Sequence, residues 1–92
     1  MLINFTEQGM EKIKNLPKRV MTARKGIERV GGKFVLWNLT MGSYDSVAIV
    51  ELPDDAALAS IILGAGKEGN IETTTLKAFS ETEAAKIIAK VS

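Results

Sequence analysis

The stretch from Lys33 to Leu52 constrains the fold more than any other part of the chain. It holds two runs of β-branched, aromatic and other apolar residues on either side of Met41-Gly42-Ser43, which is the pattern of a β-hairpin. Gly42-Ser43 suits a two-residue loop whose first position has a positive φ, because glycine has no Cβ to clash there. We therefore expect a hairpin in which Gly42 is the structural residue of the turn.

Before the hairpin, the sequence predicts a short strand and an interrupted helix. Leu2–Phe5 is apolar, and Thr6 is a good N-cap for the helix that follows. Pro17 should break or kink this helix, because proline has no amide donor and disfavours helical geometry at the residue before it. A second helical segment should then run to Gly31-Gly32, a sequence typical of a left-handed C-cap.

After the hairpin, the signals are helix, strand and helix. Asp54-Asp55 marks a helix start, and an apolar stripe at helical spacing follows. We expect this helix to end in the region of Gly64, Gly66 and Gly69. A threonine-rich strand is predicted from Asn70 to Phe79, and Ser80–Glu83 is a capping box before a last amphipathic helix.

The resulting order, β-α-β-β-α-β-α, predicts an α+β fold. It is the ferredoxin-like βαββαβ unit, an antiparallel four-stranded sheet with helices on one face, plus an extra C-terminal helix. An open sheet face in water should alternate apolar and polar residues. Here Val35, Trp37 and Leu39 are predicted on one side of their strand, with Phe34 and Leu36 on the other. Both sides are apolar, so we expect a second sheet to cover the open face.

The composition narrows the class of protein. Ninety-two residues predict one domain, residues 1–92, with a small core that needs further stabilisation. The absence of cysteine and histidine excludes disulfides, the usual zinc ligands and the usual haem ligand. Oligomerisation is the remaining way to stabilise so small a core, so we expect a homodimer at least. We expect no metal and no cofactor. No signal peptide or membrane-length apolar run is visible, which favours a cytoplasmic protein.

The net charge of +1 conceals an uneven distribution. Between Lys12 and Lys33 there are eight basic residues and one acid, Glu28. Such a stretch can bind nucleic acid, but binders usually carry an overall basic excess. We therefore favour a solvated helix face and rank nucleic-acid binding last.

The chain resembles the GYD-domain family, small prokaryotic proteins named for a Gly-x-Tyr-Asp hairpin. The segments that carry the resemblance are Asn4–Gly9, Pro17–Arg19, Gly31-Gly32, Gly42–Asp45, Glu51–Asp55, Gly69-Asn70 and Thr73–Leu76 with Phe79. Single segments are weak signals, but their order and spacing together are specific. The resemblance implies a dimeric α/β barrel, in which two ferredoxin-like sheets of strand order 4-1-3-2 pack face to face. It implies no particular activity.

Tyr44 and Asp45 are the candidate catalytic pair. A phenol and a carboxylate beside a tight turn can polarise a small substrate, and a carboxylate against Trp37 can act as a base. The alternative, which we favour, is that Asp45 accepts hydrogen bonds from the turn backbone while Tyr44 packs at the sheet edge. Candidate ligand-binding residues are Asn4, Trp37, Asn38 and Tyr44. For Trp37, core or interface packing is the favoured role.

These residues leave open whether the protein is an enzyme. The first hypothesis is a non-catalytic oligomeric α/β barrel that binds a small apolar or aromatic ligand. The alternative is a cofactor-free isomerase or monooxygenase-like enzyme that uses Tyr44 and Asp45. The lack of histidine counts against the enzyme, because histidine is the commonest acid–base group.

Overall fold

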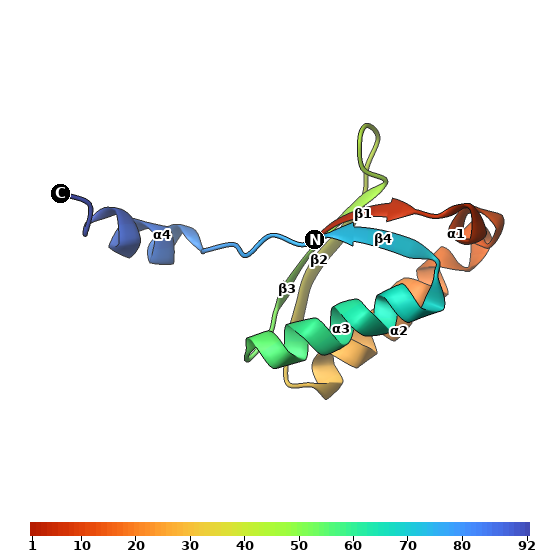
Figure 1. The fold of residues 1–92 in the computed structure, drawn as a ribbon, viewed down its shortest axis with the longest axis horizontal. Helices are drawn as coiled ribbons and strands as arrows, with labels where there is room; N and C mark the ends of the chain where they lie inside the picture. Colours follow the sequence, from red (N-terminus) through yellow and green to blue (C-terminus); the bar gives the residue numbers. More distant parts are fainter.

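The computed structural model describes residues 1–92 and confirms the predicted α+β architecture (Figure 1). Its strands form one antiparallel sheet of order β2-β3-β1-β4, the ferredoxin-like order. The strands are β1 (Leu2–Phe5), β2 (Lys33–Leu39), β3 (Ser46–Glu51) and β4 (Ile71–Thr74). The helices are α1 (Glu7–Glu11), the 3₁₀ turn η1 (Ile13–Asn15), α2 (Leu16–Arg29), α3 (Asp55–Glu68) and α4 (Glu81–Ile88). Helices α2 and α3 lie on the same side of the sheet (Figure 1).

Local signals set the ends of the first helices. The break before α2 is confirmed, and Pro17 lies in the first turn of α2, where its missing N–H costs nothing. At the other end Gly31 has a φ of 84°. The amide of Gly31 donates to the carbonyl of Glu28, and that of Gly32 donates to Ile27. These two bonds make a Schellman motif, which satisfies the last carbonyls of the helix.

The structure corrects two predicted boundaries in the second half of the chain. Gly64 and Gly66 lie inside α3, and only Gly69, with a φ of 73°, ends the helix. The strand predicted from Asn70 to Phe79 stops at Thr74, where β4 pairs with Leu2. The first residue of β1 therefore limits how far β4 can be hydrogen-bonded.

A β-bulge at Val35 also changes the predicted sides of β2. Phe34 pairs with Val50, but the next pair is Leu36 with Ile49, so Val35 is the extra residue. Phe34, Trp37 and Leu39 consequently share the helix side of the sheet, and Val35 does not belong with Trp37 and Leu39. The open side still carries apolar residues, namely Leu2, Leu36, Val47 and Ile49.

The core is small and lies between the sheet and α2. Its buried apolar residues are Ile3, Ile27 and Ala48, and Ser46 beside them is 0% exposed. Met1 extends the sheet, because its nitrogen donates to the carbonyl of Ala48 and its carbonyl accepts from the amide of Ala48.

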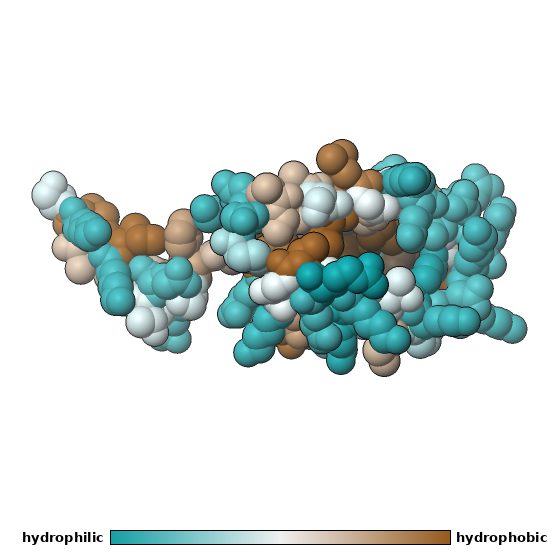
Figure 2. All heavy atoms as spheres, turned by 90° about the horizontal axis from the view of Figure 1, so that it is seen from below, coloured by the Kyte–Doolittle hydropathy of each residue, from teal (hydrophilic) through white to brown (hydrophobic).

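Residues 75–92 form an arm that leaves the sheet beyond β4 (Figure 1). The arm gives the molecule its long dimension, 51 Å against 31 and 18 Å for the other two. The predicted capping box is confirmed: the Ser80 hydroxyl accepts from the amide of Glu83, and the Glu83 carboxylate accepts from the amide of Ser80, each at 3.1 Å. Hydrogen bonding of the Glu83 carboxylate to Ser80, first from the backbone amide and then from the side chain, lowers the pKa of Glu83. Figure 2 shows apolar atoms exposed on the arm as well as on the body.

Candidate functional site

The hairpin loop between β2 and β3 protrudes from the sheet (Figure 1) and is longer than predicted. The amide of Thr40 donates to the carbonyl of Asp45 at 2.9 Å, so the loop proper is the four residues 41–44. Gly42 adopts a φ of 131°, a conformation that residues with a Cβ rarely enter. Met41 is fully exposed at the end of the loop. The loop therefore presents an apolar, flexible side chain to solvent.

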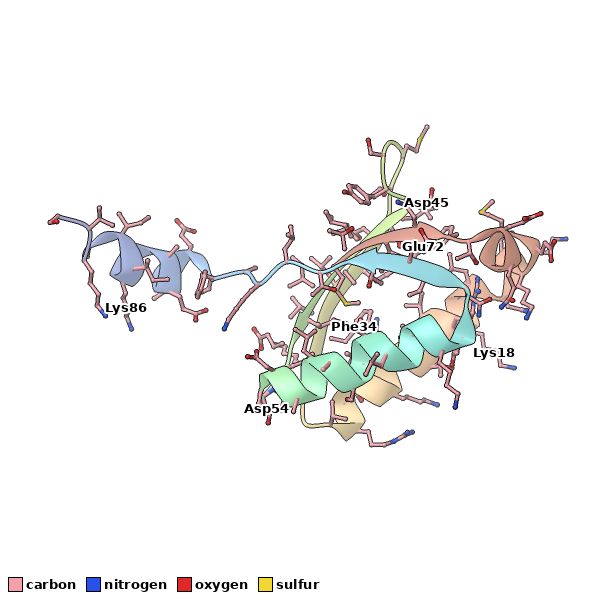
Figure 3. All side chains as sticks on the ribbon, viewed as in Figure 1. Lys18, Phe34, Asp45, Asp54, Glu72 and Lys86 are labelled. Atoms are coloured by element: carbon pink, nitrogen blue, oxygen red, sulfur yellow. The ribbon has the colours of Figure 1, made fainter.

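Asp45 lies at the base of this loop, beside β1 (Figure 3). Its carboxylate Oδ2 accepts from the amide of Phe5 at 2.8 Å, and its own amide donates to the carbonyl of Ile3 at 2.9 Å. The carboxylate thus takes the place of a backbone acceptor in the ladder between β1 and β3. This hydrogen bond connects the hairpin to the central strand β1. The carboxylate that the sequence offers as a candidate base is therefore already hydrogen-bonded to the backbone.

The sheet separates the remaining candidate residues. Trp37 lies on the helix side, paired with Ala48, whereas Asn38 pairs with Val47 on the open side. Asn4 is also on the open side, opposite Glu72 of β4. Tyr44 is half-buried in the loop, and its carbonyl accepts from the Thr40 hydroxyl at 2.6 Å. Trp37 is therefore not brought together with the two asparagines.

A cleft of about 820 Å³ lies between the helix side of the sheet, α2 and α3. Its wall includes Arg19 and Ser46, which sequence reasoning did not single out. Arg19 Nη2 donates to the carbonyl of Gly9 at 3.3 Å, while its Nε and Nη1 are buried without a hydrogen-bond partner. The Ser46 hydroxyl is also buried without a partner. Buried polar atoms of this kind are rare, because leaving one unpaired costs stability.

The helical and strand periods of the sequence could have identified Arg19 and Ser46 as inward-facing residues. Arg19 precedes Ala23 and Ile27 at intervals of four along α2, which places it on the inward face of the helix. Ser46 alternates with Ala48 and Val50 along β3, which places it on the helix side of the sheet.

No group of three or more potential metal ligands is present in the structure. None of its helices combines the length and the apolar character that are needed to cross a membrane.

Comparisons with known proteins establish the family. The sequence model of the GYD domain matches residues 1–88, from the first strand to the end of α4. The chain belongs to the GYD family. A curated relative from Thermus thermophilus, described as "Glutamine synthetase and cystathionine beta-lyase binding protein", is 32% identical over 79 residues. The match covers 85% of this chain and 83% of that relative. No solved structure matches the chain.

Two of the GYD-type segments meet where α3 turns into β4. The Thr6 hydroxyl donates to the carbonyl of Gly69 at 2.6 Å, and Gln8 Nε2 donates to Asn70 Oδ1 at 2.9 Å. A Cβ on Gly9 would come within 2.1 Å of the carbonyl oxygen of Asn70. Both segments are therefore explained by a backbone contact that closes the first βα unit against the last strand.

A second pair of these segments, Gly31-Gly32 and Glu51–Asp55, meets at the C-terminal end of α2. A Cβ on Gly32 would lie 2.6 Å from the carbonyl oxygen of Glu51 and 2.8 Å from the Leu52 side chain. Only glycine allows the end of α2 to approach the end of β3 so closely. Together with the bond from Phe5 to Asp45, these contacts give several of the segments that carry the resemblance a role in the fold.

Proposed function

We propose that this chain is a small non-catalytic protein that binds a metabolic enzyme. The observation that carries the proposal is the match, over most of both chains, to the Thermus thermophilus relative, which is described as binding glutamine synthetase and cystathionine β-lyase. Because the match covers 85% of this chain and 83% of the relative, it compares the same structural unit rather than a shared fragment.

The position of Asp45 supports binding over catalysis. A base must be free to reach the proton that it abstracts, and the carboxylate of Asp45 already accepts the Phe5 amide. Trp37 lies across the sheet from Asn4 and Asn38, so the candidates do not line one substrate pocket.

The hairpin loop is the proposed contact with the enzyme. It protrudes from a rigid sheet, which is where binding residues are commonly placed. Met41 at its tip is fully exposed, and methionine adapts to irregular partner surfaces. The open sheet face, with Leu36, Val47 and Ile49, is proposed to pack against the same face of a second copy and form the dimeric barrel.

The test uses purified glutamine synthetase and cystathionine β-lyase encoded by the same genome, each titrated with this protein in a calorimeter. We expect one of them to bind. Met41→Asp should weaken that binding strongly, because it places a charge at the centre of the contact. Met10→Asp is the matched control, since Met10 is half-exposed on α1 and away from the loop. Absence of binding to either enzyme would overturn the proposal.

The cleft supports a second candidate function, the binding of a small aromatic carboxylate. Arg19 and Ser46 offer unpaired donors, and aromatic side chains such as Trp37 line the same cavity. Trp37 is the only tryptophan, so its fluorescence should report a titration with phenylacetate. Arg19→Gln should abolish that response and Arg19→Lys should retain part of it. No response of the parent to phenylacetate would exclude this candidate.

A further inference from the structure

The arm of residues 75–92 carries an apolar stripe that has no partner in its own chain. Ile88 is 67% exposed, and Phe79, Ile87 and Val91 are exposed as well. A helix of eight residues such as α4 is marginal in water without tertiary contacts. The family match nevertheless includes α4 to its last residue. The arm therefore belongs to the family's structural unit and requires a surface to pack on.

A second unpartnered apolar surface lies at the far edge of the body. A groove of about 600 Å³ runs between α2 and β2, and six of its eight lining residues are hydrophobic. Met21 on α2 is 51% exposed and Leu39 on β2 is 64% exposed. Trp37 forms part of the wall. We call this surface the α2–β2 groove.

The arm and the α2–β2 groove lie at opposite edges of the sheet. The arm continues from β4, whereas the groove adjoins β2, and the strand order is β2-β3-β1-β4. Four strands span about 14 Å, at roughly 4.8 Å for each of three spacings. Residues 75–79 span at most about 17 Å when fully extended, and they lead away from the body (Figure 1). Crossing the sheet would use nearly the whole linker and leave little length to reach the groove between α2 and β2, so the groove of a second copy is the more accessible one.

One pair of opposite charges is available where the first turn of α4 would meet the groove. Arg24 lines the groove, and its guanidinium carbon is 4.9 Å from the centroid of the Phe34 ring, a contact that positions the cation. The first turn of α4 carries Glu81 and Glu83. An acidic first turn laid beside Arg24 would gain a favourable charge interaction while the apolar stripe enters the groove.

We propose that two copies of this chain exchange their C-terminal arms, so that α4 of each copy lies in the α2–β2 groove of the other. The exchange is reciprocal, and two-fold symmetry closes it without leaving an unpaired arm. It is compatible with sheet-to-sheet packing, because a two-fold axis parallel to the strands places the β4 edge of one sheet beside the β2 edge of the other. The small core favours a second copy as the partner. The chain needs the additional buried surface whenever it is folded, and another copy of the same chain is always present with it.

The experiment uses the full chain, which has no natural cysteine. Ile88→Cys and Met21→Cys proteins are co-expressed with tags of different size and treated with a short bismaleimide. We expect a cross-linked heterodimer, which can form only between chains. Thr82→Cys replaces Ile88→Cys in the matched control, because Thr82 lies on the opposite face of α4; its yield should be several-fold lower. Ile88→Cys alone should give little product, since the two arms occupy separate grooves.

The outcomes separate this inference from the proposed enzyme binding. Absence of the cross-linked heterodimer, or a yield no higher than that of the Thr82→Cys control, would overturn the arm exchange. The result of the calorimetric test with the two enzymes does not depend on this outcome. Ile88→Asp should shift the Trp37 emission to longer wavelength by exposing the groove, whereas Thr82→Asp should not. Equal spectra for these two variants would also count against the exchange.

Discussion

The body of the molecule, residues 1–74, and the arm, residues 75–92, are held in shape by different interactions. In the body, hydrogen bonds join residues far apart in the sequence, such as Thr6 with Gly69 and Phe5 with Asp45. In the arm, the capping bonds connect Ser80 with Glu83, three residues apart. The body is thus organised by close backbone approaches, whereas the arm has only its local signals.

The largest expected effect tests the body, at Gly9. Gly9→Ala should destabilise the protein by about 3 kcal/mol, because the new Cβ would displace the backbone of Asn70. Gly64→Ala is the matched control, since a Cβ there meets nothing within 4 Å. Within α3 this change should stabilise by about 0.5–1 kcal/mol. Urea denaturation measures the stability of both variants, and equal midpoints would show that the contact between Gly9 and Asn70 is not tight.

A smaller effect is expected at Asp45. Asp45→Ala leaves the Phe5 amide without its acceptor and should cost about 1–3 kcal/mol. Asp45→Asn keeps an acceptor oxygen and should cost less. Glu72→Ala serves as a control, because Glu72 is exposed on the edge strand β4. If Asp45→Ala unfolds at the same urea concentration as the parent, the carboxylate does not hold the hairpin to β1.

The smallest effect concerns the arm and its pH dependence. Because hydrogen bonds from Ser80 lower the folded pKa of Glu83, its contribution to α4 is present above the unfolded pKa of about 4.3. That contribution is lost as the pH falls through the lower folded pKa. Amide chemical shifts of Ala84 and Ala85 should follow this loss of helix. Glu83→Gln should remove the step and Glu81→Gln should leave it, so a step that persists in Glu83→Gln would contradict the assignment.

Much of the fold was predictable because its signals are local. The capping box at Ser80, the helix break at Pro17 and the Schellman end at Gly31 depend only on neighbouring residues, and all are confirmed. The hairpin was predicted for the same reason. Its loop is longer than expected, because the ladder ends at the bond between Thr40 and Asp45, and residue types alone do not specify where a ladder ends.

The candidate site was less predictable, because it depends on which side of the sheet each residue occupies. The bulge at Val35 places Phe34 and Trp37 on the same side, which strict alternation does not anticipate. Asp45 was expected to bond its own turn, yet its carboxylate meets the amide of Phe5 from a strand forty residues away. Arg19 and Ser46 were overlooked, although helical and strand periods place both inward.

The sequence by itself determined the elements, their order and their caps, because these follow from interactions between residues a few positions apart. The tertiary structure decided where each strand and helix ends and which side of the sheet each residue occupies. β4 ends at Thr74 because its neighbour β1 begins at Leu2, although its threonine-rich sequence could continue as a strand. Gly64 and Gly66 remain helical because the left-handed turn is formed only at Gly69, whose loop meets Thr6 and Gln8. In each case a partner distant in sequence supplies the hydrogen bonds that select one of several locally acceptable conformations.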